Sequence, residues 1–128
     1  MSSRSAFISG ALLCAFGVAL GAFGAHALED NVTPDRLDTW NTAVRYQLVH
    51  GLGLLVAGMI IERFQGIWFR RSAILLLAGV CIFAGSLYIL VLLNVPWLGA
   101  LAPVGGIAMI TGWAGMCLAF VLTKGAAQ

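Results

Sequence analysis

The feature that most constrains this chain is a series of four apolar runs, each long enough to cross a lipid bilayer. A membrane-spanning helix needs about 20 mostly apolar residues, because the hydrocarbon core is about 30 Å thick and each helical residue rises about 1.5 Å. The four predicted helices cover about residues 5–27, 34–62, 72–94 and 101–123, and the membrane part of the second starts near residue 43. The sequence therefore predicts an all-α integral membrane protein, with residues 1–128 folded as one antiparallel bundle of four transmembrane helices.

The composition excludes a water-soluble domain. Of the 128 residues, 61% are apolar and 9% are charged, whereas soluble domains carry about 25% charged residues. A net charge of +2 without a cluster of lysines or arginines also argues against a nucleic-acid partner. The expected partner is the lipid bilayer, with other membrane proteins or further copies of this chain as possible additional partners.

The first apolar run has an alternative interpretation as a secretion signal. Arg4, the apolar run and the tripeptide Ala25-His26-Ala27 together imitate a cleavable signal. The run is longer than the usual core of such a signal, so we favour a membrane helix that is retained.

The start of the second helix is marked by turn and capping residues. Thr33 suits an N-cap and Pro34 suits the first helical turn, so this helix is expected to begin outside the membrane. Asp38, Asn41 and Arg45 are spaced three and four apart and would form a wet face among the lipid headgroups. There Arg45 can pair with Asp38 or reach acidic groups of the first loop, in either case as a solvated interface charge.

The distribution of basic residues predicts the orientation in the membrane. Four spans put the N-terminus, the connection at about residues 62–71 and the C-terminus on one side. That side holds Arg4, Arg63, Arg70, Arg71 and Lys124. The other side holds only Arg36 and Arg45. Because basic loops stay in the cytoplasm, both termini are predicted to be cytoplasmic.

Small residues lie on one face of each predicted helix, where they would let helix backbones approach closely. These faces consist of Gly10, Gly17, Gly21 and Gly24 on the first helix, Ala43, Tyr46, His50, Gly53 and Ala57 on the second, Ser72, Gly79 and Ser86 on the third, and Gly105, Ala108, Gly112, Gly115 and Ala119 on the fourth. The face of the second helix differs because it includes two large polar residues, Tyr46 and His50.

His50 is the strongest candidate for chemistry, because an ionisable group deep in a span is costly. It would act in a proton relay or polar ligand pocket, or it would be a neutral histidine bonded to another helix, and we favour the second interpretation. Haem ligation by His26 and His50 is disfavoured because the two residues lie at different depths. A soft-metal site formed by Cys14, Cys81 and Cys117 is also disfavoured, and no cofactor or metal is predicted.

No catalytic motif is visible. The sequence has no nucleophile next to a base and no phosphate-binding loop. Small four-helix exporters use a carboxylate embedded in the membrane, and the nearest candidate here is Glu62, at a helix end. This argues against proton-coupled export. We therefore expect a protein that is not an enzyme.

Four ordered segments carry a family resemblance: Gly21 to Leu28 (GAFGAHAL), the spaced Trp40, Ala43, Tyr46, Gln47 and His50, Phe83 to Leu90 (FAGSLYIL), and Pro103 to Trp113 (PVGGIAMITGW). With these, the chain resembles the YgdD-like family of small bacterial inner-membrane proteins, which has small transmembrane relatives in animals. The resemblance implies a four-helix inner-membrane protein and no particular activity. Ala84 departs from the serine that is more usual in the family, which weakens any hydroxyl site there.

The polar or amphipathic members of these segments are the candidate ligand-binding residues: His26, Trp40, Tyr46, Gln47, His50, Ser86 and Tyr88. The leading hypothesis is a non-enzymatic membrane protein that acts by packing against lipids or membrane-protein partners. The alternative is a binder or carrier of a small molecule, lipid or cofactor in an outer-leaflet pocket around His26, Tyr46, Gln47 and His50.

Overall fold

The computed structural model describes residues 1–125, and residues 126–128 lie outside the described part. Its elements are α1 (Ser3–Phe23), a π-helical turn η1 (Gly24–Leu28), α2 (Pro34–Phe64), α3 (Ile67–Leu93), a 3-10 segment η2 (Pro96–Leu101) and α4 (Ala102–Gly125). In this described part, four helices are long and apolar enough to cross a membrane. The protein is therefore an all-α integral membrane protein with an antiparallel arrangement of four spans.

The helix ends follow local sequence signals, with one difference from expectation. α2 begins at Pro34 after an extended Thr33, and α3 ends at Leu93, followed by the capping residue Asn94 in the left-handed conformation with φ 51°. The connection between α2 and α3 is shorter than the predicted residues 62–71, because only Gln65 and Gly66 are not helical. Arginine is a good helix former, so the basic residues of this region extend the helices instead of forming a loop.

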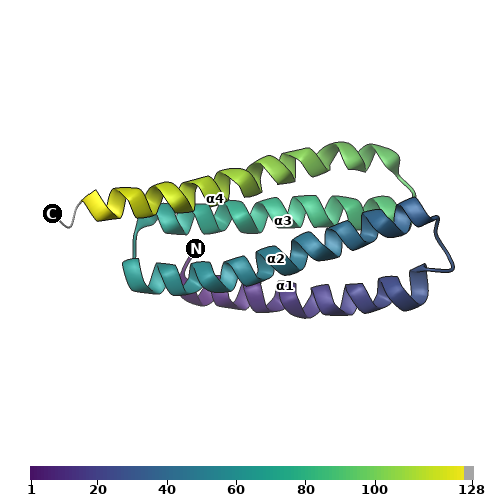
Figure 1. Cartoon of the computed structure of the whole chain (residues 1–128), viewed down its shortest axis with the longest axis horizontal. Coiled ribbons are helices and arrows are strands. Elements are labelled where there is room, and N and C mark those ends of the chain that lie inside the picture. Colours follow the sequence, from purple (N-terminus) through teal and green to yellow (C-terminus); the bar gives the residue numbers. More distant parts are fainter. Residues whose placement is uncertain (126–128) are drawn as a thin grey trace.

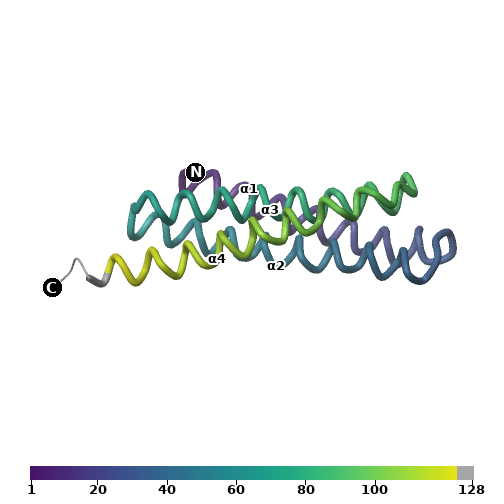
Figure 2. Tube along the Cα trace, turned by 90° about the horizontal axis from the view of Figure 1, so that it is seen from above, coloured from purple at the N-terminus to yellow at the C-terminus, as the bar shows by residue number. Residues whose placement is uncertain are grey.

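The helices lie side by side in chain order (Figure 1). α1 packs mainly on α2, α2 on α3, and α3 on α4. The N-terminus and the end of α4 lie at the same end of the molecule, which we call the terminal end; the opposite end, with the α1–α2 and α3–α4 connections, is the loop end (Figure 1). In the second view the last turns of α4 again extend beyond the other helices (Figure 2).

This order makes α2 and α3 the inner helices and α1 and α4 the outer ones. In the most apolar window of each helix, 50% of α2 and 44% of α3 is buried, against 17% of α1 and 28% of α4. The outer helices therefore offer most of their surface to the membrane.

Glycines bring the neighbouring helices into backbone contact. A Cβ atom added to Gly10 would lie 2.7 Å from the Gly51 carbonyl oxygen, so α1 and α2 touch without side chains between them. In the same way, a Cβ atom on Gly79 would lie 2.8 Å from the Gly105 carbonyl oxygen, across the α3–α4 contact. The predicted small-residue faces of α1, α3 and α4 are thus confirmed as packing faces.

Candidate functional site

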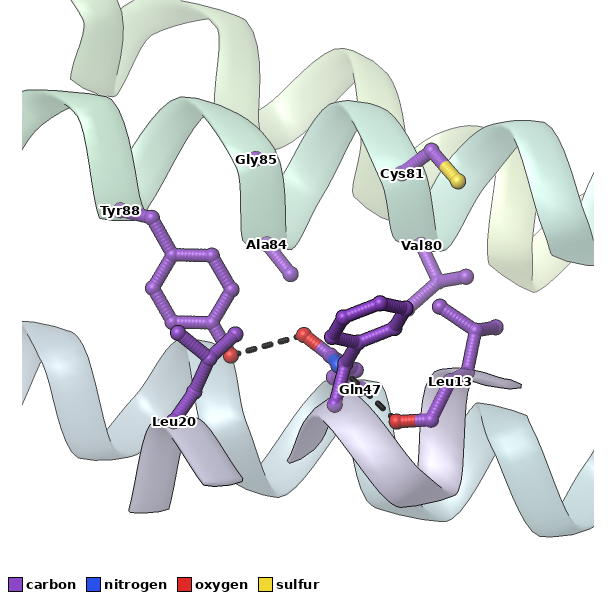
Figure 3. Close-up of a pocket in the computed structure, with 9 residues that line it drawn as sticks. Leu13, Leu20, Gln47, Val80, Cys81, Ala84, Gly85 and Tyr88 are labelled. Atoms are coloured by element: carbon purple, nitrogen blue, oxygen red, sulfur yellow. Dashed lines mark hydrogen bonds between the residues drawn. The ribbon is translucent and has the colours of Figure 1, made fainter. Parts of the chain in front are cut away.

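Gln47 in α2 bonds to two other helices. Its side chain is 4% exposed. Its Nε2 donates to the Leu13 carbonyl oxygen of α1 at 2.9 Å, and its Oε1 accepts a hydrogen bond from the Tyr88 hydroxyl of α3 at 2.8 Å (Figure 3). Both ends of the amide are therefore used to link three helices.

Trp40 and Tyr88 extend this link toward the loop end. Trp40 Nε1 donates to the Leu20 carbonyl oxygen at 2.9 Å, and its ring centroid lies 4.6 Å from that of Tyr88. Gly24, at the start of η1, makes room for the indole, since a Cβ atom there would lie 2.7 Å from Trp40 Cδ1. We call Trp40, Gln47 and Tyr88 the Gln47 network.

A groove of about 260 Å³ between α1 and α3 lies beside Gln47 and Tyr88 of this network (Figure 3). Its lining is mostly apolar and comprises Leu13, Phe16, Leu20, Gln47, Val80, Cys81, Ala84, Gly85 and Tyr88. We call it the α1/α3 groove. Its polar members, Gln47 and Tyr88, bond to each other, so the groove mainly offers an apolar surface.

His50 makes a second interhelical link, from α2 to α4. Trp113 Nε1 donates to His50 Nε2 at 3.2 Å, and His50 Nδ1 lies 2.8 Å from the Tyr46 carbonyl oxygen. An indole N–H can only donate and a carbonyl oxygen can only accept, so these partners place the proton on Nδ1. Both ring nitrogens of this buried histidine are then satisfied in the neutral form.

Tyr46 borders two adjoining hollows on this side of the molecule. Its ring packs 4.5 Å from the Phe83 ring and is 41% exposed. One hollow, of about 270 Å³, is lined by Tyr46, His50, Phe83, Gly106, Met109, Ile110 and Trp113. The other, of about 410 Å³, is lined by Arg45, Tyr46, Val49 and His50. Because Tyr46 and His50 line both, we treat the two hollows together as the α2/α4 groove.

The structure does not gather the seven candidate residues in one pocket. Trp40, Gln47 and Tyr88 form the Gln47 network, whereas Tyr46 and His50 line the α2/α4 groove. Ser86 is buried but donates to the Phe83 carbonyl oxygen of its own helix. His26 is exposed in η1.

Trp113 is a site residue that the candidate set lacked. Tryptophan concentrates at membrane interfaces, and Trp113 instead lies near the middle of α4 (Ala102–Gly125). A tryptophan in the middle of a span was therefore the available signal that its N–H has a specific partner.

The metal and haem alternatives gain no support from the geometry. No group of three His, Cys, Asp or Glu side chains within the described residues is placed to hold a metal ion. Cys81 and Cys117 are exposed, whereas Cys14 is partly buried against Gly51. Haem ligation by His50 would require breaking its bond to Trp113 or to Tyr46.

Four antiparallel apolar helices, joined by glycine contacts and by two polar links, define a small polytopic membrane protein. Residues 20–106 match the model of the family described as "Protein of unknown function (DUF423)". The chain belongs to this family, in agreement with the resemblance seen in the sequence.

Its relatives are membrane proteins. Over 124 residues the chain is 36% identical to the UPF0382 inner membrane protein YgdD of Escherichia coli K12, covering 97% of this chain and 95% of that protein. It is 42% identical over 107 residues to the UPF0382 membrane protein YwdK of Bacillus subtilis, covering 83% and 87%. It is 45% identical over 106 residues to a UPF0382 membrane protein of Staphylococcus epidermidis, covering 83% and 86%. No solved structure matches the chain.

Proposed function

We propose that this protein is a non-enzymatic component of the bacterial inner membrane that acts by binding lipids or other membrane proteins along its exposed helix faces. The observation that carries the proposal is the open packing of the helices in chain order. Of the most apolar stretch of each outer helix, only 17% is buried in α1 and 28% in α4. Such surfaces, together with the α1/α3 and α2/α4 grooves, are available to partners in the bilayer.

The use of the polar side chains supports the same proposal. Gln47, Tyr88 and His50 are the kinds of residue that could serve chemistry, but each bonds within the protein. Within residues 1–123, every buried side-chain nitrogen and oxygen has a hydrogen-bond partner. These groups stabilise the packing of the helices, which suits a protein whose role is association.

The test is purification of the intact protein in a mild detergent, followed by native mass spectrometry and by affinity capture from cross-linked membranes. We expect retained lipid or a specific membrane-protein partner at a defined ratio. Finding neither, together with measurable turnover of a substrate, would overturn the proposal.

A second candidate function is the binding or carriage of a small molecule or cofactor. It is favoured by the α1/α3 groove, whose lining places the Gln47 amide and the Tyr88 hydroxyl beside apolar walls. An absorption spectrum and native mass spectrometry of the purified protein would reveal a bound chromophore or quinone. Their absence in protein taken directly from membranes would count against this candidate.

We also propose that both termini face the cytoplasm. Arg4, Arg63, Arg70 and Arg71 belong to the terminal end, whereas Glu29, Asp30, Asp35 and Asp38 belong to the loop end. Basic segments are retained in the cytoplasm. Reporter fusions at each terminus test this, and an active periplasmic reporter at either end would refute it.

A further inference from the structure

Arg45, which the sequence predicts on a wet face among the headgroups, lies well away from the loop end of the four packed helices. Its neighbour Val44 packs against Gly21, where an added Cβ atom would lie 3.4 Å from the valine side chain. Gly21 precedes the end of the first span, at Leu28, by seven residues, which corresponds to about 10 Å along a helix. Arg45 therefore leaves α2 about 10 Å inward from the loop end of the first span.

The inner helices give the same depth. Tyr46, the next residue of α2, packs on Phe83 with ring centroids 4.5 Å apart. Phe83 lies midway along α3 between Arg71 and Asn94, which are suited to the two membrane surfaces. In a bilayer of about 30 Å centred on α3, the α-carbon of Arg45 would therefore be closer to the middle of the bilayer than to a headgroup layer.

Arg45 has no counter-charge in the part of the chain that the structure describes. It is exposed, and among residues 1–123, whose side chains the structure describes, it forms no ion pair or side-chain hydrogen bond, whereas Arg36 donates to Asn94 Oδ1 at 3.1 Å. The expected pair with Asp38, two turns away on α2, does not form. A charged side chain at this depth is costly unless it reaches water or an anion.

The direction of α2 indicates where that anion lies. Side chains on a helix lean toward its N-terminus, and the N-terminus of α2 is at the loop end (Figure 1). The long arginine side chain therefore extends toward the loop-end headgroups, as arginines in spans commonly do. Lipid phosphates are the anions at that level.

The α2/α4 groove continues from Arg45 toward the middle of the membrane. The hollow of about 410 Å³ includes Arg45, and the adjoining hollow of about 270 Å³ runs past Gly106 and Ile110 to Trp113. Apart from His50, whose nitrogens are satisfied, the second hollow is lined mainly by apolar and aromatic side chains. The groove thus has a positive charge at the end nearer the headgroups and an apolar lining deeper in, which matches the polarity of a phospholipid.

We propose that the α2/α4 groove binds an anionic phospholipid of the loop-end leaflet, with the lipid phosphate on the Arg45 guanidinium and an acyl chain against Tyr46, Gly106 and Trp113. This inference rests on the proposed function and narrows it to one class of ligand and one face. A planar guanidinium suits phosphate because it donates two parallel hydrogen bonds.

The experiment measures lipid retention by native mass spectrometry of the full chain titrated with phosphatidylglycerol or phosphatidylcholine. The wild-type protein should retain phosphatidylglycerol preferentially. Arg45→Gln should weaken phosphatidylglycerol retention about fivefold, the effect expected for one basic residue near anionic lipid, and should leave phosphatidylcholine retention unchanged. Arg36→Gln is the matched control on the same helix, because Arg36 lies outside this groove, and it should behave like the wild type.

A pair of glycine variants tests the acyl-chain part of the groove. A Cβ atom on Gly106 or on Gly85 meets nothing within 4 Å, so leucine can be placed at either position without a clash at Cβ. Gly106→Leu fills the α2/α4 groove and should reduce retention of both lipids. Gly85→Leu fills the α1/α3 groove and should leave preferential phosphatidylglycerol retention intact.

Each outcome has a distinct meaning. Arg45→Gln protein that retains phosphatidylglycerol as well as the wild type overturns the inference, and so does Gly106→Leu protein with unchanged retention. Wild-type protein that holds both lipids equally overturns the anionic preference while the broader proposed function stands. Wild-type protein with neither lipid nor partner defeats the proposed function itself. If circular dichroism shows that Arg45→Gln does not fold, the test uses Arg45→Lys together with the Gly106→Leu and Gly85→Leu variants.

Discussion

Gly105 and Gly106 are adjacent in α4 but face different surroundings, so replacing each with alanine tests how α3 and α4 are held together. A Cβ atom on Gly105 would lie 2.6 Å from the Phe83 nitrogen and 2.7 Å from the Gly79 carbonyl oxygen, whereas ordinary contact begins at 3.4 Å. All the obstructing atoms are backbone, so no side chain can rotate away. The two helices would have to separate by most of an ångström along their contact.

The expected cost of Gly105→Ala is about 1–3 kcal/mol of unfolding free energy, the usual range for overpacking a close contact. Gly106→Ala should instead be neutral or stabilising by up to about 1 kcal/mol, since its Cβ atom meets open space and alanine is the better helix former. The assay is reversible unfolding in matched bilayers or micelles. Gly85→Ala serves as a control for an open glycine on α3. Equal stabilities of the Gly105 and Gly106 variants would refute the inference that backbone contact joins α3 to α4.

Three further predictions concern the polar links and the π-helical turn. Gln47→Leu should lower the unfolding free energy by about 1–2 kcal/mol, because two interhelical hydrogen bonds are lost. Unchanged stability in thermal unfolding would show that these bonds contribute nothing. A double-mutant cycle of His50→Leu and Trp113→Phe should give a coupling of about 0.6 kcal/mol and at most about 1.7 kcal/mol, whereas strictly additive losses would show that the pair does not interact. Gly24→Ala should displace the buried indole beside it and quench or shift its fluorescence, while Gly21→Ala, whose Cβ would lie 3.4 Å from its neighbour, should not; identical spectra would contradict this geometry.

The spans and their packing faces could be predicted from the sequence. The length of an apolar run specifies a membrane crossing, because the thickness of the bilayer is fixed. The spacing of Gly10, Gly17 and Gly24 specifies one face of the first span, because small residues on that face allow close backbone approach. These rules need no knowledge of the partner helix.

To predict which residues meet in the site, one must know the heights of the helices relative to one another, and a single sequence does not contain this information. The contacts of Gly10 with Gly51 and of Gly79 with Gly105 set the heights of α1 against α2 and of α3 against α4, and the packing of α2 on α3 sets the height of one pair against the other. They place Gln47 beside α1 and α3, and they bring Trp113 to His50, a residue 63 positions away in the sequence. For the same reason the depth of Arg45 could not be judged from the start of its own apolar run.

Packing between chain neighbours also bears on how the molecule is assembled. Most contacts join successive helices and have short sequence separations, and chains of that kind close few long loops while folding. The Gly10–Gly51 contact and the Gln47 bond to Leu13 lie wholly within the first two helices. This helical hairpin can form the glycine contact and the hydrogen bond before the second half of the chain has been synthesised. The nascent chain can therefore dock its helices one at a time as each enters the bilayer.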